Sequence, residues 1–121
     1  MKEKKDYNYF NNLLDLLNQN VKVVIDRKKN SIHPKYPNII YKVNYGYIEN
    51  IVAPDNEFQD AYVLGIDEPI DEFYGKVIAI IHRNDDIEDK LIVSNKEYSN
   101  EEIKKLIEFQ EKYFDYEIIR K

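Results

Sequence analysis

The stretch that decides the fold is Val77-Ile78-Ala79-Ile80-Ile81-His82, an uninterrupted apolar run that ends in a histidine. A short apolar run without polar alternation is typical of a β-strand that is buried on both faces. The run therefore predicts a central strand, and the segments around it are expected to supply the rest of a sheet.

Shorter β-type segments precede and follow this strand, and turn signals separate them. Strands are expected at 21–25, at 39–47 with a break at Gly46, at 61–66 and at 91–93. Pro34 and Pro37 mark the loop between the first two of these strands. Short strands at regular spacing predict a small barrel or a curled sheet.

A helix is expected at each end of the strand region. Residues 6–19 follow a plausible N-cap, Asp6, and carry apolar side chains at helical spacing: Tyr7, Phe10, Leu13, Leu14 and Leu17. Ser99 and Glu102 fit a capping box for a second helix that runs to about Tyr113. We expect one mainly β (α+β) domain over 1–121, with a helix in 1–20, a barrel in 21–98 and a helix in 99–116.

Composition narrows the class of protein. The 121 residues fit one domain, and 43% hydrophobic and 34% charged residues of both signs favour a globular chain over a disordered one. The net charge of −5 argues against a nucleic-acid partner. The chain has no cysteine, no apolar signal segment at 1–12 and no apolar run of membrane-spanning length, so we expect a cytoplasmic protein without a membrane partner.

Two acidic loops precede hydrophobic strands. One holds Asp55, Glu57 and Asp60, and the other, at 85–89, holds four acids: Asp85, Asp86, Glu88 and Asp89. If neighbouring strands bring these loops together, the carboxylates repel one another unless divalent cations lie between them. Such a cluster suits a two-metal site for Mg²⁺ or Mn²⁺ that activates water against a phosphorus atom. Judged by spacing alone, solvated turns are the alternative.

A locally basic segment, 27–35, is consistent with an anionic ligand, and it includes Arg27, His33 and Lys35. Lys90 follows the second acidic loop directly, at the start of a strand, where its ammonium group can face an anion site. For both features a solvated surface is the alternative. The chain shows neither a Gly-rich phosphate loop nor a Ser-His-Asp arrangement.

Four segments, taken in order, resemble soluble (family I) inorganic pyrophosphatases. Val43-Asn44-Tyr45-Gly46-Tyr47-Ile48 resembles their N-Y-G-Y-I segment, and Asp55-Asn56-Glu57-Phe58-Gln59-Asp60-Ala61 resembles their Asp-x-Asp-Pro-x-Asp signature. The stretch 85–93 resembles their Asp…Glu-Asp-x-Lys-Leu segment, and 110–115 resembles their C-terminal His-Tyr-Lys-Asp. The resemblance covers roughly residues 21–116.

This resemblance implies a five-stranded, OB-like barrel with flanking helices, and Mg²⁺-dependent hydrolysis of pyrophosphate or a related small phosphorylated anion. It implies metal ligands at Asp55, Asp60 and Asp89, at Asp85 or Asp86, and at Asp26. It places Glu57 where an aspartate helps to activate the water. It implies that phosphate or that water is contacted by Tyr45, Lys90, Tyr113 and Lys35. The family's substrate arginine has no clear counterpart, and Arg27 or Arg83 is expected to replace it. Family members often assemble, so the helix at 7–17 either forms a homo-oligomer interface or caps the barrel.

The sequence also departs from the family pattern. Glu57 is one methylene longer than the family's aspartate, and Phe114 replaces a lysine that faces phosphate. The metal-binding carboxylates of the site are therefore expected to be retained, and the cationic residues that contact phosphate are expected to be fewer. Three functions stay open: a pyrophosphatase, a metal-dependent hydrolase of another phosphorylated substrate, and a non-catalytic binding module on the same scaffold.

Overall fold

The structure is a computed structural model, and it describes residues 7–121. Two helices and six strands follow one another along the chain. Their bounds are α1 Tyr7–Leu16, β1 Asn20–Arg27, β2 Asn44–Val52, β3 Phe58–Val63, β4 Glu72–Arg83, β5 Lys90–Ser94, α2 Asn100–Glu111 and β6 Tyr116–Ile119. No helix among these residues is long and apolar enough to cross a membrane.

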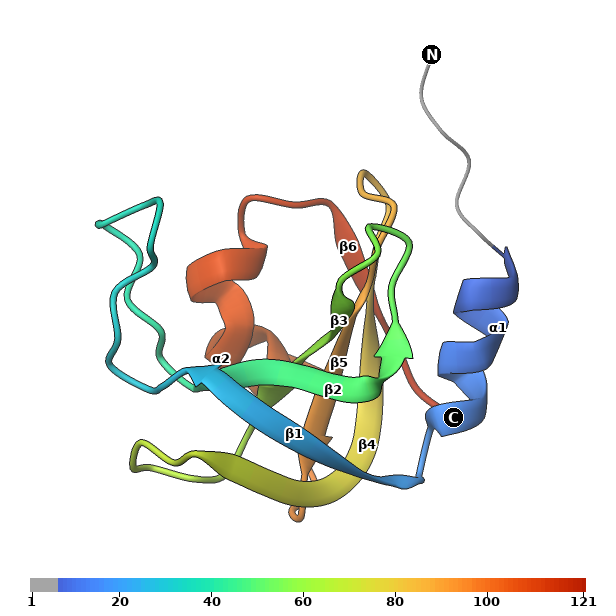
Figure 1. The fold of residues 1–121 in the computed structure, drawn as a ribbon, viewed down its shortest axis with the longest axis horizontal. Coiled ribbons are helices and arrows are strands. Elements are labelled where there is room, and N and C mark those ends of the chain that lie inside the picture. The colour runs from blue at the N-terminus through green and yellow to red at the C-terminus, as the bar shows by residue number, and fades with distance from the viewer. Residues whose placement is uncertain (1–6) are drawn as a thin grey trace.

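Five strands close into a barrel, in the order β1-β2-β3-β5-β4, because β4 also pairs with β1. The β3–β5 pair is parallel, and the other four pairs of the ring are antiparallel. In Figure 1, α1 lies at one end of the barrel and α2 lies against its side. The expected mainly β fold, a small OB-like barrel with two helices, is confirmed.

Strand β4 holds the barrel together, as its apolar run predicts. Val77, Ala79, Ile80 and Ile81 are fully buried. The first half of β4 pairs with β1, and its second half, Ile80 to Arg83, pairs with β6. The sequence did not predict β6, because its four residues are too few to show a periodic pattern.

The two faces of the barrel strands pack against different helices. Ala61, Val63, Leu91 and Val93 belong to one buried cluster, which includes Leu13 of α1. Their immediate neighbours belong to a second cluster, which includes Ile103 and Ile107 of α2, and these neighbours are Tyr62, Leu64 and Ile92. This alternation is the period of two that a strand imposes on its side chains. Helix α1 therefore packs its apolar side on the barrel, and α2 covers a wall.

Several element ends differ from the sequence-based expectation. Strand β2 begins at Asn44 rather than at 39, and 28–43 form a long loop with one isolated bridge, Ile32 to Ile40. Helix α1 ends at Leu16 rather than at 19, because Asn18 adopts a left-handed conformation with φ 69°. The expected N-cap Asp6 and the side chain of Tyr7 lie outside the described part of the chain.

Strand β2 runs straight through Gly46, where a break was expected. A Cβ atom at this position would lie 1.8 Å from the carbonyl oxygen of Val24 on β1. The glycine is therefore required by the close approach of β1 and β2 at this point.

Gly46→Ala is expected to lower the free energy of unfolding by about 2–3 kcal/mol, because the added methyl group must push β1 away from β2. Urea unfolding of the variant and of the unmutated protein measures this difference. Equal unfolding midpoints would contradict the close approach of the two strands.

Candidate active site

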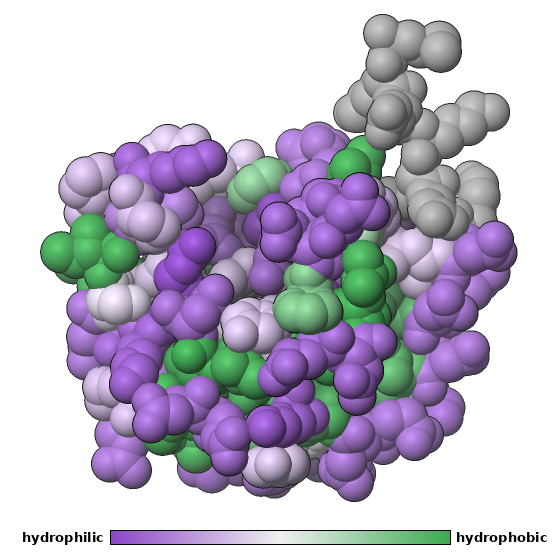
Figure 2. All heavy atoms as spheres, in the orientation of Figure 1, coloured by the Kyte–Doolittle hydropathy of each residue, from purple (hydrophilic) through white to green (hydrophobic). Residues whose placement is uncertain are grey.

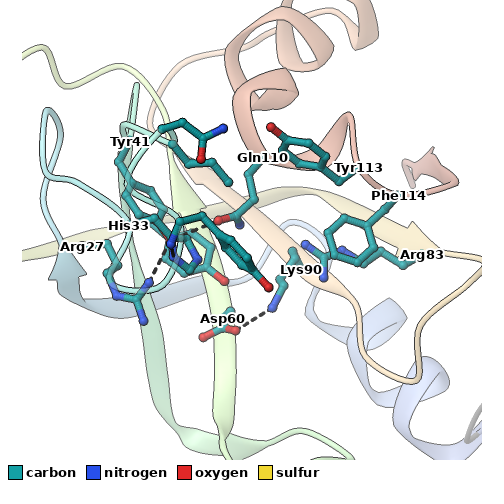
Figure 3. Close-up of a pocket in the computed structure, with 13 residues that line it drawn as sticks. Arg27, His33, Tyr41, Asp60, Arg83, Lys90, Gln110, Tyr113 and Phe114 are labelled. Carbon is teal, nitrogen blue, oxygen red and sulfur yellow. Dashed lines mark hydrogen bonds and ion pairs between the residues drawn. The ribbon is translucent and has the colours of Figure 1, made fainter.

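A cavity of about 560 Å³ opens between the 28–43 loop and the C-terminal end of α2. Tyr45 of β2, Asp60 of β3 and Lys90 of β5 line it from the barrel side. Figure 3 shows Arg27 and Arg83 on different sides of this space, with Lys90 pointing at Asp60 between them. Positive and negative groups from four strands, β1, β3, β4 and β5, therefore meet in one pocket.

Strand pairing explains why Asp60 and Lys90 meet. Strands β3 and β5 run parallel with Ala61 beside Leu91, so the preceding residues lie side by side. Nζ of Lys90 donates to Oδ2 of Asp60 at 2.6 Å and to Oε1 of Glu88 at 2.9 Å. Lys90 is only 4% exposed. Although burial acts to lower it, the Tyr45 hydroxyl and the Asp60 carboxylate hold the pKa of Lys90 above its ordinary value.

Four carboxylates form one connected group, and two of them, Asp60 and Glu88, pair with this lysine. Burial and a hydrogen bond with Asp55 raise the pKa of Glu88 to about 6. Although burial acts in the opposite direction, the hydrogen bonds from Glu88 and from the Glu57 N–H lower the pKa of Asp55. Burial, and then the charge of Asp60, raise the pKa of Asp26. We call Asp26, Asp55, Asp60 and Glu88 the acidic cluster. The four carboxyl groups can carry more negative charge than the single positive charge of Lys90 neutralises.

The raised pKa of Glu88 has a consequence for folding. Glu88 binds its proton more tightly in the folded chain, so the stability of the metal-free protein is expected to fall as pH rises from 4.5 to about 6. The change in pKa from 4.5 to about 6 corresponds to roughly 2 kcal/mol. The lowered pKa of Asp55 acts in a separate window, below its ordinary value of 3.8.

Urea unfolding in EDTA at the two ends of that pH window measures this loss for the unmutated protein and for Glu88→Gln. The variant should lack the part of the loss that Glu88 contributes. An identical loss in both proteins would contradict the raised pKa of Glu88.

A continuous chain of hydrogen bonds links the two arginines of the pocket. Nη1 of Arg27 donates to the Tyr41 hydroxyl at 2.9 Å, which donates to Oε1 of Gln110 at 3.0 Å. Nε2 of Gln110 donates to the Tyr62 hydroxyl at 2.7 Å, which donates to Oε2 of Glu111 at 2.6 Å. Such a network holds its members in one arrangement, so the end of α2 fixes both sides of the pocket.

Glu111 completes this chain by holding Arg83. Nε and Nη2 of Arg83 donate to its two carboxylate oxygens at 2.9 and 2.5 Å. Nη1 of Arg83 donates to Asp86 at 3.0 Å, and the guanidinium lies 3.6 Å from the centre of the Phe114 ring. Although burial acts to lower it, the Glu111 carboxylate raises the pKa of Arg83. Arg83 therefore stays charged beside the cavity.

The structure brings some of the predicted site residues together and leaves others apart. Those that line the cavity are Arg27, Tyr45, Asp60, Arg83, Lys90 and Tyr113. Asp26, Asp55 and Lys35 are not among the lining residues, although Asp55 is hydrogen-bonded to Glu88 and the charge of Asp60 acts on Asp26. Glu57 is exposed in the turn before β3.

The convergence expected for the second acidic loop is not seen. The Asp89 carboxylate is fully buried, and its oxygens lie 3.0 Å from Nδ1 of His82 and 3.0 Å from the Arg83 N–H. Asp86 pairs with Arg83, and Asp85 accepts from the Asp115 N–H at 3.2 Å. Side chains alternate along the chain that leads into β5, so Glu88 lies on the same side as Lys90, with which it pairs, while Asp89 faces away.

Glu88 is a candidate site residue that the resemblance to the family segment did not identify. Residue identity aligns Glu88-Asp89 with the family's Glu-Asp, although this chain has one residue fewer before the lysine. Spacing from Lys90 was the usable signal, because residues two apart on an extended segment share a face. Tyr41 and Gln110 were missed for another reason, since their contact spans 69 positions of sequence.

The donor chemistry of the acidic cluster suits a hard divalent cation, because all its ligating atoms are carboxylate oxygens. Among residues 7–121, no three His, Asp or Glu side chains are placed around one metal-sized point. Nζ of Lys90 lies between Asp60 and Glu88 instead. The acidic cluster therefore has the donor type and the excess negative charge that Mg²⁺ requires, but not the arrangement of its ligands.

Comparison with known proteins places the fold. No protein-family model matches the chain, and no curated protein matches it. The inorganic pyrophosphatase of Ehrlichia chaffeensis has a similar structure, with a TM-score of 0.66, 14% identity and coverage of 86% of this chain and 87% of that chain. The inorganic pyrophosphatase of Helicobacter pylori has a TM-score of 0.62 and 15% identity, with coverage of 100% of this chain and 91% of that chain. The enzyme of Thermus thermophilus has a TM-score of 0.56 and 15% identity, with coverage of 84% of this chain and 80% of that chain.

Proposed function

We propose that this chain, which has the fold of the inorganic pyrophosphatases, hydrolyses inorganic pyrophosphate to phosphate with the help of Mg²⁺. The observation that carries the proposal is the meeting of Asp60 with Lys90, Arg27 and Arg83 at one cavity, while Glu88, another member of the acidic cluster, also pairs with Lys90. A phosphate ligand needs cationic donors, and a metal that neutralises it needs carboxylates.

The acidic cluster would hold the metal, with Asp60 and Glu88 nearest to Lys90 and with Asp55 and Asp26 beside them. When bound, Mg²⁺, or Mn²⁺ in its place, would supply positive charge for the phosphate oxygens and acidify a water molecule. Asp89 is not included, because its carboxylate is buried against His82 and Arg83.

The remaining groups of the cavity act on the substrate directly. Lys90, Arg27 and the Tyr113 hydroxyl donate to phosphate oxygens. Burial raises the pKa of Tyr45, so its hydroxyl keeps its proton and donates a hydrogen bond. In the reaction, a water oxygen bonds to one phosphorus, the bridging P–O bond breaks, and the leaving phosphate takes the electron pair. One proton of the water passes to solvent.

Phosphate release from pyrophosphate, measured with MgCl₂, with MnCl₂ and with EDTA, tests the proposal. We expect release that requires a divalent ion. Metal binding without any release would favour the non-catalytic module. Release from other phosphorylated compounds but not from pyrophosphate would favour a hydrolase of a different substrate.

Lys90→Met is expected to lower kcat/KM for pyrophosphate about 100-fold, since it removes a buried cationic donor at the site of reaction. Lys35→Met removes the same charge from a residue that does not line the cavity, and it is the matched control. Equal losses in the two variants would show that the effect comes from overall charge rather than from the site.

A further inference from the structure

Aromatic rings line much of the cavity. Six of the residues that line it carry one: His33, Tyr36, Tyr41, Tyr45, Tyr113 and Phe114. Pyrophosphate has only charged and polar oxygens on its surface, so it gains little from ring faces. The ionic contacts and the aromatic surface therefore call for two different parts of one ligand.

Two of these rings are open to a ligand on opposite sides of the cavity. Tyr36, from the 28–43 loop, is 56% exposed, and Tyr113, beyond the end of α2, is 54% exposed. Exposed tyrosines offer an apolar face and a polar tip, and such rings are common at binding surfaces. Figure 2 shows a largely hydrophilic surface in which apolar side chains emerge on the outer part of this loop, where Ile32 and Ile40 are also exposed.

The 28–43 loop is built to hold its rings in place. Nδ1 of His33 accepts hydrogen bonds from the N–H groups of Lys35 and Tyr36 at 3.0 and 3.3 Å. The His33 ring lies nearly parallel to that of Tyr41, with centroids 6.0 Å apart and an interplanar angle of 10°. Burial, with the charges of Arg27 and Lys35, lowers the pKa of His33, so this ring is neutral at physiological pH.

The size of the cavity supports a ligand larger than pyrophosphate. Its volume of about 560 Å³ lies within the range of roughly 300–1,000 Å³ that accommodates organic ligands of drug size. Phe114 also covers Arg83, which leaves fewer cationic groups for a compact and highly charged anion. A ligand that adds stacking contacts would offset that loss.

We propose that the substrate class of this site includes nucleoside triphosphates, with the phosphate chain at Lys90 and Arg27 and the base stacked on the ring of Tyr36. This inference rests on the proposed function for its reaction. A water oxygen bonds to the terminal phosphorus, and the bridging bond to the next phosphate breaks. The nucleoside diphosphate leaves with the electron pair, and one water proton passes to solvent.

Phosphate release from ATP and from inorganic tripolyphosphate, in the presence of MgCl₂, tests the inference. Both compounds carry the same three phosphates, so the ratio of their kcat/KM values isolates the nucleoside. Removal of one stacking ring changes affinity by roughly 5- to 150-fold. Tyr36→Ala should therefore lower the ATP to tripolyphosphate ratio by that factor, and Tyr36→Phe should preserve it.

Tyr74→Ala is the matched control, because Tyr74 is 63% exposed and does not line the cavity. Its ratio should equal that of the unmutated protein. A Tyr36→Ala ratio that is also unchanged, or a protein that hydrolyses pyrophosphate and tripolyphosphate but not ATP, would overturn the inference and leave the proposed function standing.

Calorimetric titration with ATP and with tripolyphosphate tests the inference in the case where the protein hydrolyses none of these compounds. If no compound is hydrolysed, the proposed function fails, and binding alone then decides the inference. Tighter binding of ATP than of tripolyphosphate, lost in Tyr36→Ala, supports the aromatic subsite. Equal binding of the two compounds contradicts it.

Discussion

Asp60→Asn is expected to lower kcat for pyrophosphate by about 1,000-fold while the protein stays folded. The Asp60 carboxylate receives the buried Lys90 ammonium group at 2.6 Å, and its charge also acts on Asp26 and Tyr45. Asparagine keeps the size of the side chain but removes the charge that pairs with the lysine and that the proposed metal would need. Phosphate release under saturating Mg²⁺ measures the loss, and circular dichroism checks the fold.

Asp85→Asn is the matched control for this prediction. Asp85 is exposed, and its side chain accepts a hydrogen bond from the Asp115 N–H rather than facing Lys90. We expect this variant to keep the activity of the unmutated protein. Comparable losses in both variants would mean that Asp60 has no special role and that the site lies elsewhere.

Glu111→Ala is expected to lower the free energy of unfolding by about 3–5 kcal/mol, because it leaves the Arg83 guanidinium buried without its principal partner. Glu111 also accepts the hydrogen bond of Tyr62, so the chain that links Arg27 to Arg83 is broken at its Arg83 end. Urea unfolding measures the change. Glu108→Ala, an exposed glutamate on the same helix, is expected to change stability by less than about 0.5 kcal/mol.

Similar midpoints for the Glu111 and Glu108 variants would contradict the structural role of this ion pair. A loss of stability confined to Glu111→Ala would show instead that the end of α2 is tied to the barrel through Arg83. The position of the second arginine of the pocket depends on that link.

The sequence allowed the architecture to be predicted because the barrel depends on local patterns. The apolar run at 77–81 and the Ser99–Glu102 capping box each report on their own segment, and the structure contains both the strand and the cap. Two features lay beyond such patterns. The path of β2 through Gly46 depends on its contact with Val24, and the pairing of β6 depends on the distant end of β4.

The candidate site was predictable only in part, for a similar reason. Tyr45, Asp60 and Lys90 follow from short segments that the strands then bring together. Glu88 rather than Asp89 pairs with Lys90 because of the direction in which each side chain points. Residue identity in a sequence motif does not give that direction. The chain from Arg27 to Arg83 joins residues far apart in sequence, so no segment reports it.

Phosphorus-31 NMR of pyrophosphate mixed with the protein tests the central claim most directly, because it identifies substrate and product in one spectrum. With the protein and Mg²⁺ both present, we predict that the pyrophosphate resonance gives way to that of orthophosphate, and that EDTA or Asp60→Asn stops the conversion. A pyrophosphate resonance that persists beside folded, unmutated protein and Mg²⁺ would contradict the account.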